Sequence, residues 1–236
     1  MLHTAFETGA SVATGVRASL DAQGREETTV VVWAGDGGTF DIGFQALSAA
    51  AERNENFLYV CYDNEAYMNT GAQRSSATPI GSWTTTTPSS SPKGRPKKDI
   101  LGILAAHRIP YAATASVAFP EDLMAKVSRA KMIHGLRFLH ILAPCPSGWK
   151  YEPDLTIRLA RLAVETCLFP LVEVEAGADP RLTYVPSRAR PVAEYLSLQG
   201  RFSHLNSETM AAIQRDVERK WADLYTRAGA RPAATV

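Results

Sequence analysis

The segment Thr29-Val30-Val31-Val32-Trp33-Ala34-Gly35-Asp36-Gly37, together with Asn64 farther along the chain, decides the fold. Asn64 comes just after a second apolar run, Phe57–Tyr62, and a helical stretch of small residues, Ile42–Arg53, separates the two runs. Strand, loop, helix and strand in this order predict a βαβ unit with two neighbouring parallel strands. We therefore expect an α/β fold with a mostly parallel, doubly wound sheet and a helical C-terminal tail.

Polar side chains follow both predicted strands at the point where each strand ends. Asp36 lies in the Gly-Asp-Gly sequence after the first strand, and Asn64 follows the second. Ligands of open α/β sheets bind at this edge. A carboxylate and an amide oxygen placed there can hold Mg²⁺, which in turn binds a diphosphate. Gly-Asp-Gly alone favours a simple tight turn, because Gly and Asp are common turn formers.

The string from Cys61 to Pro79 contains Tyr-Asp-Asn-Glu-Ala-Tyr-Met-Asn-Thr-Gly-Ala-Gln-Arg-Ser. It resembles the β subunits of the 2-oxoacid:ferredoxin oxidoreductases, and it is most similar to their pyruvate and branched-chain oxoacid types. Further similar segments follow in the same order: Trp83 with four Thr after it, Pro144–Trp149 and Leu198–Phe202. The resemblance runs from about His3 to about Leu205. The spacing from Gly-Asp-Gly to Asn is also that of the thiamine diphosphate (ThDP) motif.

This resemblance implies a Mg²⁺-anchored ThDP site. It gives the metal ligands as the Asp36 carboxylate, the Asn64 amide oxygen and the Ala66 backbone carbonyl. The implied cofactor-binding residues are Gly35, Asp36, Gly37, Gly38, Asn64, Asn69 and Thr70. The glycines would let backbone N–H groups approach the diphosphate. Asn69 is the expected catalytic side chain, since it matches a family residue at the thiazolium end of the cofactor.

The resemblance also implies a reaction and partners. The expected reaction is CoA-dependent oxidative decarboxylation of pyruvate or a related 2-oxoacid, with ferredoxin as electron acceptor. The β subunit would work with an α subunit, which is expected to carry the carboxylate that activates the cofactor, and with γ/δ-type subunits. The strings do not determine which 2-oxoacid is used, although they are most similar to those of the pyruvate type.

The cysteines leave two interpretations open. Three cysteines, none in a C-x-x-C pair, cannot by themselves hold a [4Fe-4S] cluster, because such a cluster requires four thiolates. Cys145 matches the family's last cluster ligand, but the N-terminal segment with the other three ligands is expected to be absent. Cys145 is therefore either a ligand whose three partners come from elsewhere or a packed, reduced cysteine. Cys61 and Cys167 are expected in the core.

Without a cluster, electrons would lack a first acceptor. This favours an alternative function, the half of a non-oxidative ThDP-dependent decarboxylase or lyase. A third hypothesis is a truncated, non-catalytic subunit that keeps the fold and the partner surface.

Composition limits the remaining function classes. The 236 residues are 45% apolar, which is enough for one sizeable core. A net charge of +1 gives no electrostatic reason to expect nucleic acid as a partner. No apolar stretch approaches the roughly 20 residues of a membrane helix. The first residues lack the features of a signal peptide, so we expect a cytoplasmic protein.

Two units are predicted along the chain. Residues 1–205 form the ThDP-binding domain, and residues 206–236 form a C-terminal helix, capped by Ser207, and a tail. The irregular segment 70–98 is rich in Ser, Thr and Pro, and we interpret it as a functional loop rather than a linker. Its basic residues are expected at a solvated edge: Lys93, Arg95, Lys97 and Lys98. Leu171–Glu175 is predicted to be the last parallel strand.

Overall fold

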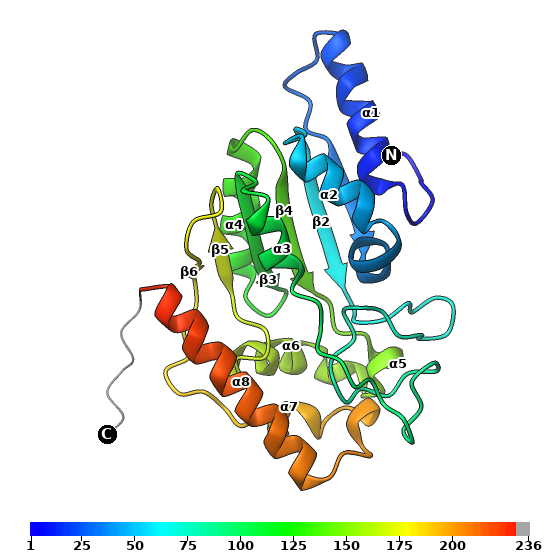
Figure 1. Cartoon of the computed structure of the whole chain (residues 1–236), viewed down its shortest axis with the longest axis vertical. Coiled ribbons are helices and arrows are strands. Elements are labelled where there is room, and N and C mark those ends of the chain that lie inside the picture. Colours follow the sequence, from blue (N-terminus) through cyan, green and yellow to red (C-terminus); the bar gives the residue numbers. More distant parts are fainter. Residues whose placement is uncertain (230–236) are drawn as a thin grey trace.

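A computed structural model describes residues 1–229 of the chain (Figure 1). Six strands form one sheet in the order β1-β2-β4-β3-β5-β6. The strands are β1 (Val31–Gly35), β2 (Leu58–Asp63), β3 (Tyr111–Ser116), β4 (Arg137–Leu142), β5 (Val172–Val174) and β6 (Arg181–Leu182). Four neighbouring strands, β1, β2, β4 and β3, pair in parallel. The predicted α/β class with a mostly parallel sheet is confirmed.

The prediction for the last parallel strand is wrong in its direction, because β5 pairs antiparallel with β3 and β6 antiparallel with β5. The helix before β5, α6 (Thr156–Glu165), lies at the carboxyl ends of the parallel strands, below the sheet in Figure 1. There the Ser116 hydroxyl donates to the Ala160 carbonyl. The chain therefore enters β5 from the carboxyl edge and runs back against its neighbour.

Helices connect and cover the strands. They are α1 (Gly9–Ala22), a π-helix (Gly37–Ile42), α2 (Phe44–Glu52), α3 (Ile100–Ala106), α4 (Pro120–Met132), α5 (Pro146–Trp149), α6, α7 (Val192–Leu196) and α8 (Ser207–Arg227). Short 3₁₀ turns lie at Pro153–Leu155 and Gly200–Phe202. The helix predicted over Ile42–Arg53 corresponds to α2, and a π-helix that was not predicted precedes it, directly after Asp36. Segment 70–98 contains no helix or longer strand, as predicted.

The two faces of the sheet have separate cores, because alternate strand residues point to opposite sides. Helices α1, α2 and α3 pack on one face, where Leu47 and Leu104 meet Tyr59 and Phe138. Helix α4 packs on the other face, with Val127 beside residues of β2, β3 and β4. Both cores fix the positions of the strand ends.

The face covered by α4 is open at its β1 end. Val31 and Trp33 are 52% and 67% exposed. An apolar groove of about 350 Å³ runs from β1 over β2 and β4 to α4, lined in part by Leu58, Val60 and Leu139. Edge strand β1 thus presents apolar side chains at the surface of the chain.

The C-terminal helices pack beyond the carboxyl edge of the sheet. Ile213 and Val217 of α8 are buried in the same cluster as Trp149. The N-cap of α8 is Asn206 rather than the predicted Ser207, because the Asn206 side chain accepts from the backbone N–H of Thr209 at 2.8 Å. The predicted tail beyond residue 229 lies outside the described residues.

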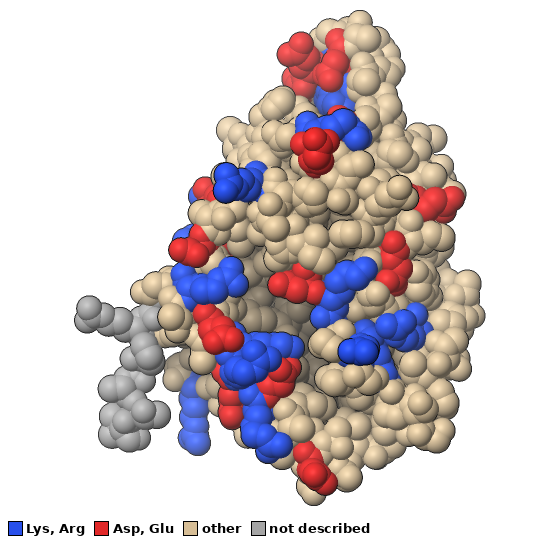
Figure 2. Space-filling view, in the orientation of Figure 1, with Lys and Arg blue, Asp and Glu red and all other residues tan. Residues whose placement is uncertain are grey.

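The surface carries charges of both signs. Figure 2 shows acidic and basic side chains lying next to each other over α8. The pairs there include Arg219 and Lys220 with Asp216. Within the described part of the chain, no helix combines the length and the apolar character that crossing a membrane requires.

Candidate functional site

The ends of β1 and β2 bring Asp36 and Asn64 together. Gly35 pairs with Tyr62 in the parallel register, so the residues that follow the two strands are neighbours at the carboxyl edge. One end of the Asn64 amide lies 2.9 Å from Asp36 Oδ1 and 2.8 Å from the Ala66 carbonyl oxygen. The expected juxtaposition of a carboxylate, an amide and a backbone carbonyl is present.

Two orientations of the Asn64 amide are chemically distinct. With nitrogen at this end, the amide donates to both Asp36 Oδ1 and the Ala66 carbonyl. With oxygen there, the Asn64 amide oxygen faces both the Asp36 carboxylate and the Ala66 carbonyl. Ligand oxygens at right angles on an octahedral Mg²⁺ lie about 2.9 Å apart, as bond lengths of 2.0–2.1 Å require. The observed spacings match that value, so the residues present fit a small, hard cation.

Asp36 is held in a buried position, with 1% of its surface exposed. The Ser75 hydroxyl donates to Asp36 Oδ2 at 2.5 Å. Burial is the main cause that raises the pKa of Asp36 to about 8, and the nearby Asp63 carboxylate is the second. Ser75 and Lys97 oppose this rise. A carboxylate in such surroundings gains from a cation beside it, because burial without a counter-charge penalises the charged form.

The glycines after β1 are required by close packing. A Cβ on Gly37 would overlap the ring of Tyr67, and a Cβ on Gly43 would overlap the Gly38 carbonyl. A Cβ on Gly35 would meet only the Tyr62 side chain, at 3.5 Å. The Tyr67 hydroxyl donates to the Gly37 carbonyl at 3.2 Å. The Gly-Asp-Gly sequence therefore forms a tightly packed entry into the π-helix.

Asn69 and Thr70 lie on an exposed hairpin. Tyr67 and Gln73 exchange backbone hydrogen bonds at 2.9 and 3.1 Å and close this hairpin. The Thr70 hydroxyl donates to the Gln73 side chain at 2.6 Å. Both Asn69 and Thr70 are exposed at its tip. The structure thus places these two residues at the rim, whereas Asp36 is buried.

Segment 70–98 contributes directly to the site. Ser75 and Thr78 are buried, and the Thr78 hydroxyl donates to the Glu65 carbonyl at 2.6 Å. Lys93 is only 3% exposed and donates to the carbonyls of Ser75, Ser76 and Thr78. The expectation of a solvated edge is wrong for Lys93, because these carbonyls face inward and require a donor.

Lys97 is the second basic residue that the sequence misplaced. Its ammonium group pairs with the Asp63 carboxylate and lies 2.8 Å from Glu65 Oε1. Burial opposes the charge on Lys97, but Asp63 and Glu65 outweigh it and raise the pKa of Lys97 above its usual value. Arg95 is exposed, as expected. Lys98 is half-buried over the Phe44 ring, with its ammonium 5.0 Å from the ring centre.

His140 completes this buried group. Its Nε2 lies 2.6 Å from Asp63 Oδ2. Burial alone would raise the pKa of Asp63, but Lys97 and His140 outweigh it and lower that pKa to about 2. Asp63 is therefore a fixed negative charge directly before Asn64.

Sequence reasoning also missed Arg201. Its guanidinium donates to Glu65 Oε2 at 2.6 Å and stacks on the Trp149 ring at 3.9 Å. The signal available was its place in the family-like string Leu198–Phe202. Three family-like strings thus meet behind the Asn64 loop.

Cys145 lies at the same edge of the sheet, half-buried, with its Sγ 3.4 Å from the Ser147 hydroxyl. Cys61 and Cys167 are buried, as predicted. Within residues 1–229, no three His, Cys, Asp or Glu side chains are grouped so that they could hold a metal ion. A cluster bound at Cys145 would therefore need ligands from outside the described residues.

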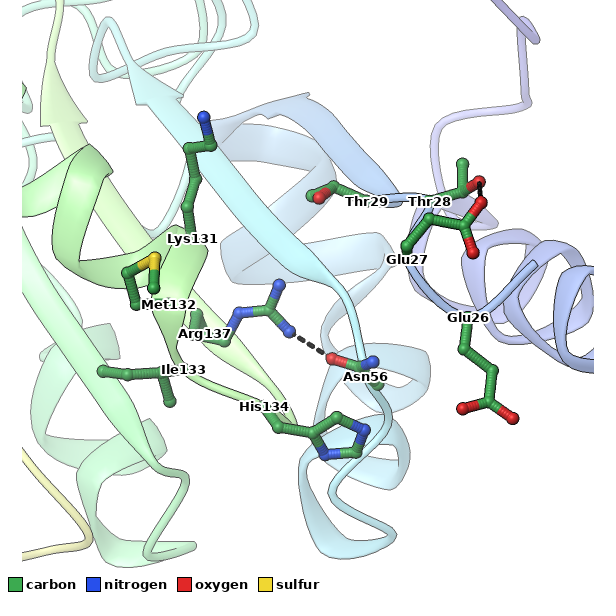
Figure 3. A pocket seen from close by; sticks show the side chains of 10 residues that line it. All are labelled: Glu26, Glu27, Thr28, Thr29, Asn56, Lys131, Met132, Ile133, His134 and Arg137. Atoms are coloured by element: carbon green, nitrogen blue, oxygen red, sulfur yellow. Dashed lines mark hydrogen bonds between the residues drawn. The ribbon is translucent and has the colours of Figure 1, made fainter. Parts of the chain in front are cut away.

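A separate cavity of about 260 Å³ lies at the opposite, amino edge of the sheet (Figure 3). There Arg137 Nη1 donates to the Asn56 side chain at 2.6 Å, as Figure 3 shows. Ligands of α/β sheets bind at the carboxyl edge instead. The candidate site is therefore the one at Asp36 and Asn64.

Comparison with known proteins identifies the family. Residues 1–141 match the family described as thiamine pyrophosphate enzyme, C-terminal TPP binding domain. The chain is 53% identical over 220 residues to pyruvate synthase subunit PorB of Methanothermobacter thermautotrophicus, a match that covers 92% of this chain and 76% of the relative. It is 49% identical over 233 residues to ketoisovalerate oxidoreductase subunit VorB of Pyrococcus abyssi, covering 95% and 75%.

A solved structure shares the fold. It is the 2-oxoglutarate:ferredoxin oxidoreductase from Magnetococcus marinus, solved with 2-oxoglutarate, coenzyme A and succinyl-CoA bound. The TM-score is 0.57 at 21% identity, over 88% of this chain and 73% of that chain. The resemblance inferred from the sequence strings is confirmed. The chain belongs to the family of pyruvate synthase subunit PorB and ketoisovalerate oxidoreductase subunit VorB, and it contains the TPP-binding domain of thiamine pyrophosphate enzymes.

Proposed function

We propose that this chain is the ThDP-binding β subunit of a 2-oxoacid:ferredoxin oxidoreductase. Together with an α subunit, it catalyses the CoA-dependent oxidative decarboxylation of pyruvate or a related 2-oxoacid. The observation that carries the proposal is the convergence of Asp36, Asn64 and Ala66 at the carboxyl edge of a sheet that belongs to this family. The relatives named above, at about 50% identity, support the substrate class.

The proposed metal ion is Mg²⁺, bound by Asp36 Oδ1, the Asn64 amide oxygen and the Ala66 carbonyl. One carboxylate and two neutral oxygens suit Mg²⁺, which usually takes one or two protein carboxylates and completes its octahedron with phosphate oxygens and water. Ser75 fixes the Asp36 carboxylate so that Oδ1 faces Asn64. Burial of Asp36 keeps bulk water away from this ligand.

ThDP, when bound, supplies the carbon nucleophile and the electron sink that decarboxylation of a 2-oxoacid requires. Gly35, Gly37 and Gly38 are proposed to bind its diphosphate beside Asp36 through their backbone N–H groups. Asn69 and Thr70 are proposed at its thiazolium end, with Asn69 contacting the substrate. Their exposed hairpin is accessible to a substrate or to a partner chain.

The proposed partners are an α subunit, γ/δ-type subunits and ferredoxin, with CoA as the acyl acceptor. Relatives of this chain are themselves named as subunits of oxidoreductases. We propose a cytoplasmic location, supported by three cysteines that are all free thiols. Cys145 is proposed as a [4Fe-4S] ligand only where three further thiolates come from another polypeptide.

A second candidate function is the half of a non-oxidative ThDP-dependent decarboxylase or lyase. The burial of Cys61 and Cys167 favours it, because within residues 1–229 this leaves Cys145 without a second accessible thiolate. Anaerobic isolation with the partner subunits, followed by iron and sulfide assays, separates the two functions. Iron-free complex that still decarboxylates would support the second candidate.

Replacement of Asp36 tests the proposed function. In Asp36→Ala we expect Mg²⁺-dependent ThDP binding to be abolished, because the only carboxylate of the proposed ligand set is lost. Calorimetric titration of ThDP at fixed Mg²⁺ measures the effect, and circular dichroism checks the fold. Asp179→Ala, which changes an exposed carboxylate, serves as the control. Unchanged ThDP affinity in Asp36→Ala would contradict the assignment.

A further inference from the structure

The loop that carries two of the proposed metal ligands has a strained residue at its centre. Asn64 presents its side chain, and Ala66 its backbone carbonyl, to the same point. Glu65 between them has φ +66°, in the left-handed region. That conformation is unfavourable for a residue other than glycine, because its Cβ crowds the following carbonyl oxygen. Glycine would adopt it freely, so the reason for a glutamate at this position must lie in its side chain.

The Glu65 side chain is buried between two cations. Arg201 Nη2 donates to Glu65 Oε2 at 2.6 Å, and Lys97 Nζ donates to Oε1 at 2.8 Å. The Arg201 side chain is 2% exposed. A buried carboxylate held by two charged donors fixes the backbone to which it is attached, because loss of either partner leaves an uncompensated buried charge.

Arg201 acts on the same loop by a second route. The Cζ atom of its guanidinium lies over the Trp149 ring, 3.9 Å from the ring centre. Trp149 is fully buried, and its indole Nε1 donates to the Asn64 backbone carbonyl at 2.7 Å. Arg201 is itself fixed, since its Nε donates to Gln199 at 2.9 Å and its carbonyl accepts from the Trp83 N–H at 2.9 Å.

We propose that Arg201 is a positioning residue for the Mg²⁺–diphosphate site, acting through Glu65 and Trp149. It directs the Asn64 carbonyl away from the metal, toward Trp149, and holds Glu65 in the turn that aims the Asn64 side chain and the Ala66 carbonyl inward. Arginine suits both tasks because its planar group stacks and donates in the plane at once, which lysine cannot do. This inference rests on the proposed function.

The test compares Arg201→Met and Arg201→Lys with the wild type, using the full chain in the assembly in which it is isolated. Calorimetry gives the apparent Mg²⁺ affinity at saturating ThDP, and thermal unfolding gives the stability. Loss of a residue that orients metal ligands weakens metal binding about 10- to 100-fold. We expect that loss for Arg201→Met and a smaller one for Arg201→Lys, which keeps the positive charge beside Glu65. Wild-type Mg²⁺ affinity in both variants would overturn the inference.

Arg137→Met is the matched control for a purely structural effect. Arg137 is also a buried arginine, 4% exposed, but it lies at the opposite edge of the sheet. It donates to Asn56 and to the Ala130 carbonyl. We expect Arg137→Met to lower the unfolding temperature and to leave Mg²⁺ affinity within twofold. Equal weakening of Mg²⁺ binding in both arginine variants would overturn a specific positioning role.

A double-mutant cycle tests the route through Glu65. If Arg201 acts through Glu65, the loss of Mg²⁺ affinity in Glu65→Gln/Arg201→Met should be smaller than the product of the losses in Glu65→Gln and Arg201→Met measured singly. Losses that multiply would overturn this route. Wild-type chain without Mg²⁺-dependent ThDP binding would overturn the proposed function, and this inference with it. If the wild type binds ThDP with Mg²⁺ and the Arg201 variants bind Mg²⁺ equally well, only the inference about Arg201 would be overturned.

Discussion

Buried charges around segment 70–98 show how individual residues stabilise the candidate site. Lys93 donates to three backbone carbonyls next to Ser75, whose hydroxyl holds Asp36. Burial, and then repulsion from Arg74 and Lys97, lower the pKa of Lys93 to about 8. The hydrogen bonds from Lys93 to these carbonyls therefore stabilise the loop. Burial of the charged ammonium group opposes that stabilisation.

The lowered pKa of Lys93 predicts a pH dependence of stability. Between about pH 8 and 10.5 the unfolded chain holds more protons at this lysine than the folded chain, so its contribution to the unfolding free energy rises with pH. From pH 7.5 to 9.5 the wild type should gain roughly 1–2 kcal/mol relative to Lys93→Met. Denaturant unfolding of both chains at the two pH values measures this difference. A constant difference would show that the Lys93 pKa is not lowered by folding.

At the scale of elements, the π-helix Gly37–Ile42 is the feature that joins β1 to α2 at the site. Such helices are short and are frequent at functional sites. Here the π-helix begins directly after Asp36, and the Tyr67 ring packs against Gly37. The hairpin that carries Tyr67 and the helix that follows Asp36 are therefore one packed unit.

This packing predicts that Gly37→Ala is destabilising. The added Cβ would overlap the Tyr67 ring, and overpacking of this kind costs about 1–3 kcal/mol. Gly15→Ala is the control, because Gly15 lies in α1 with open space around it. There alanine should stabilise the chain by about 0.5–1 kcal/mol. Thermal unfolding of both variants measures the effects, and equal stability of the two would contradict the packing described.

For the whole molecule, the sheet divides into a well-covered part and an exposed edge. Leu139 in β4 is buried, whereas Val31 in β1 is half exposed, although both line the same apolar groove. The free energy of unfolding should therefore depend strongly on the side chain at position 139 and only weakly on the one at position 31.

Paired alanine substitutions test this division. Leu139→Ala should lower the unfolding free energy by about 2–5 kcal/mol, because it removes buried side-chain atoms. Val31→Ala should change it by less than about 0.5 kcal/mol, as is usual for surface positions. Denaturant unfolding at two protein concentrations measures both. A large, concentration-dependent loss in Val31→Ala would show that another molecule covers β1 in solution.

The sequence by itself determined the elements with local signals. Apolar runs predicted strands at Thr29–Ala34 and Phe57–Tyr62, and parallel pairing then required Asp36 and Asn64 to be neighbours. Only the tertiary structure decided the direction of β5 and which charged residues are buried. Arg201 and Glu65 are 136 positions apart, and Lys97 meets Asp63 only because segment 70–98 folds back over the strand end. Burial of a charge depends on such distant partners, and no local pattern of residues encodes them.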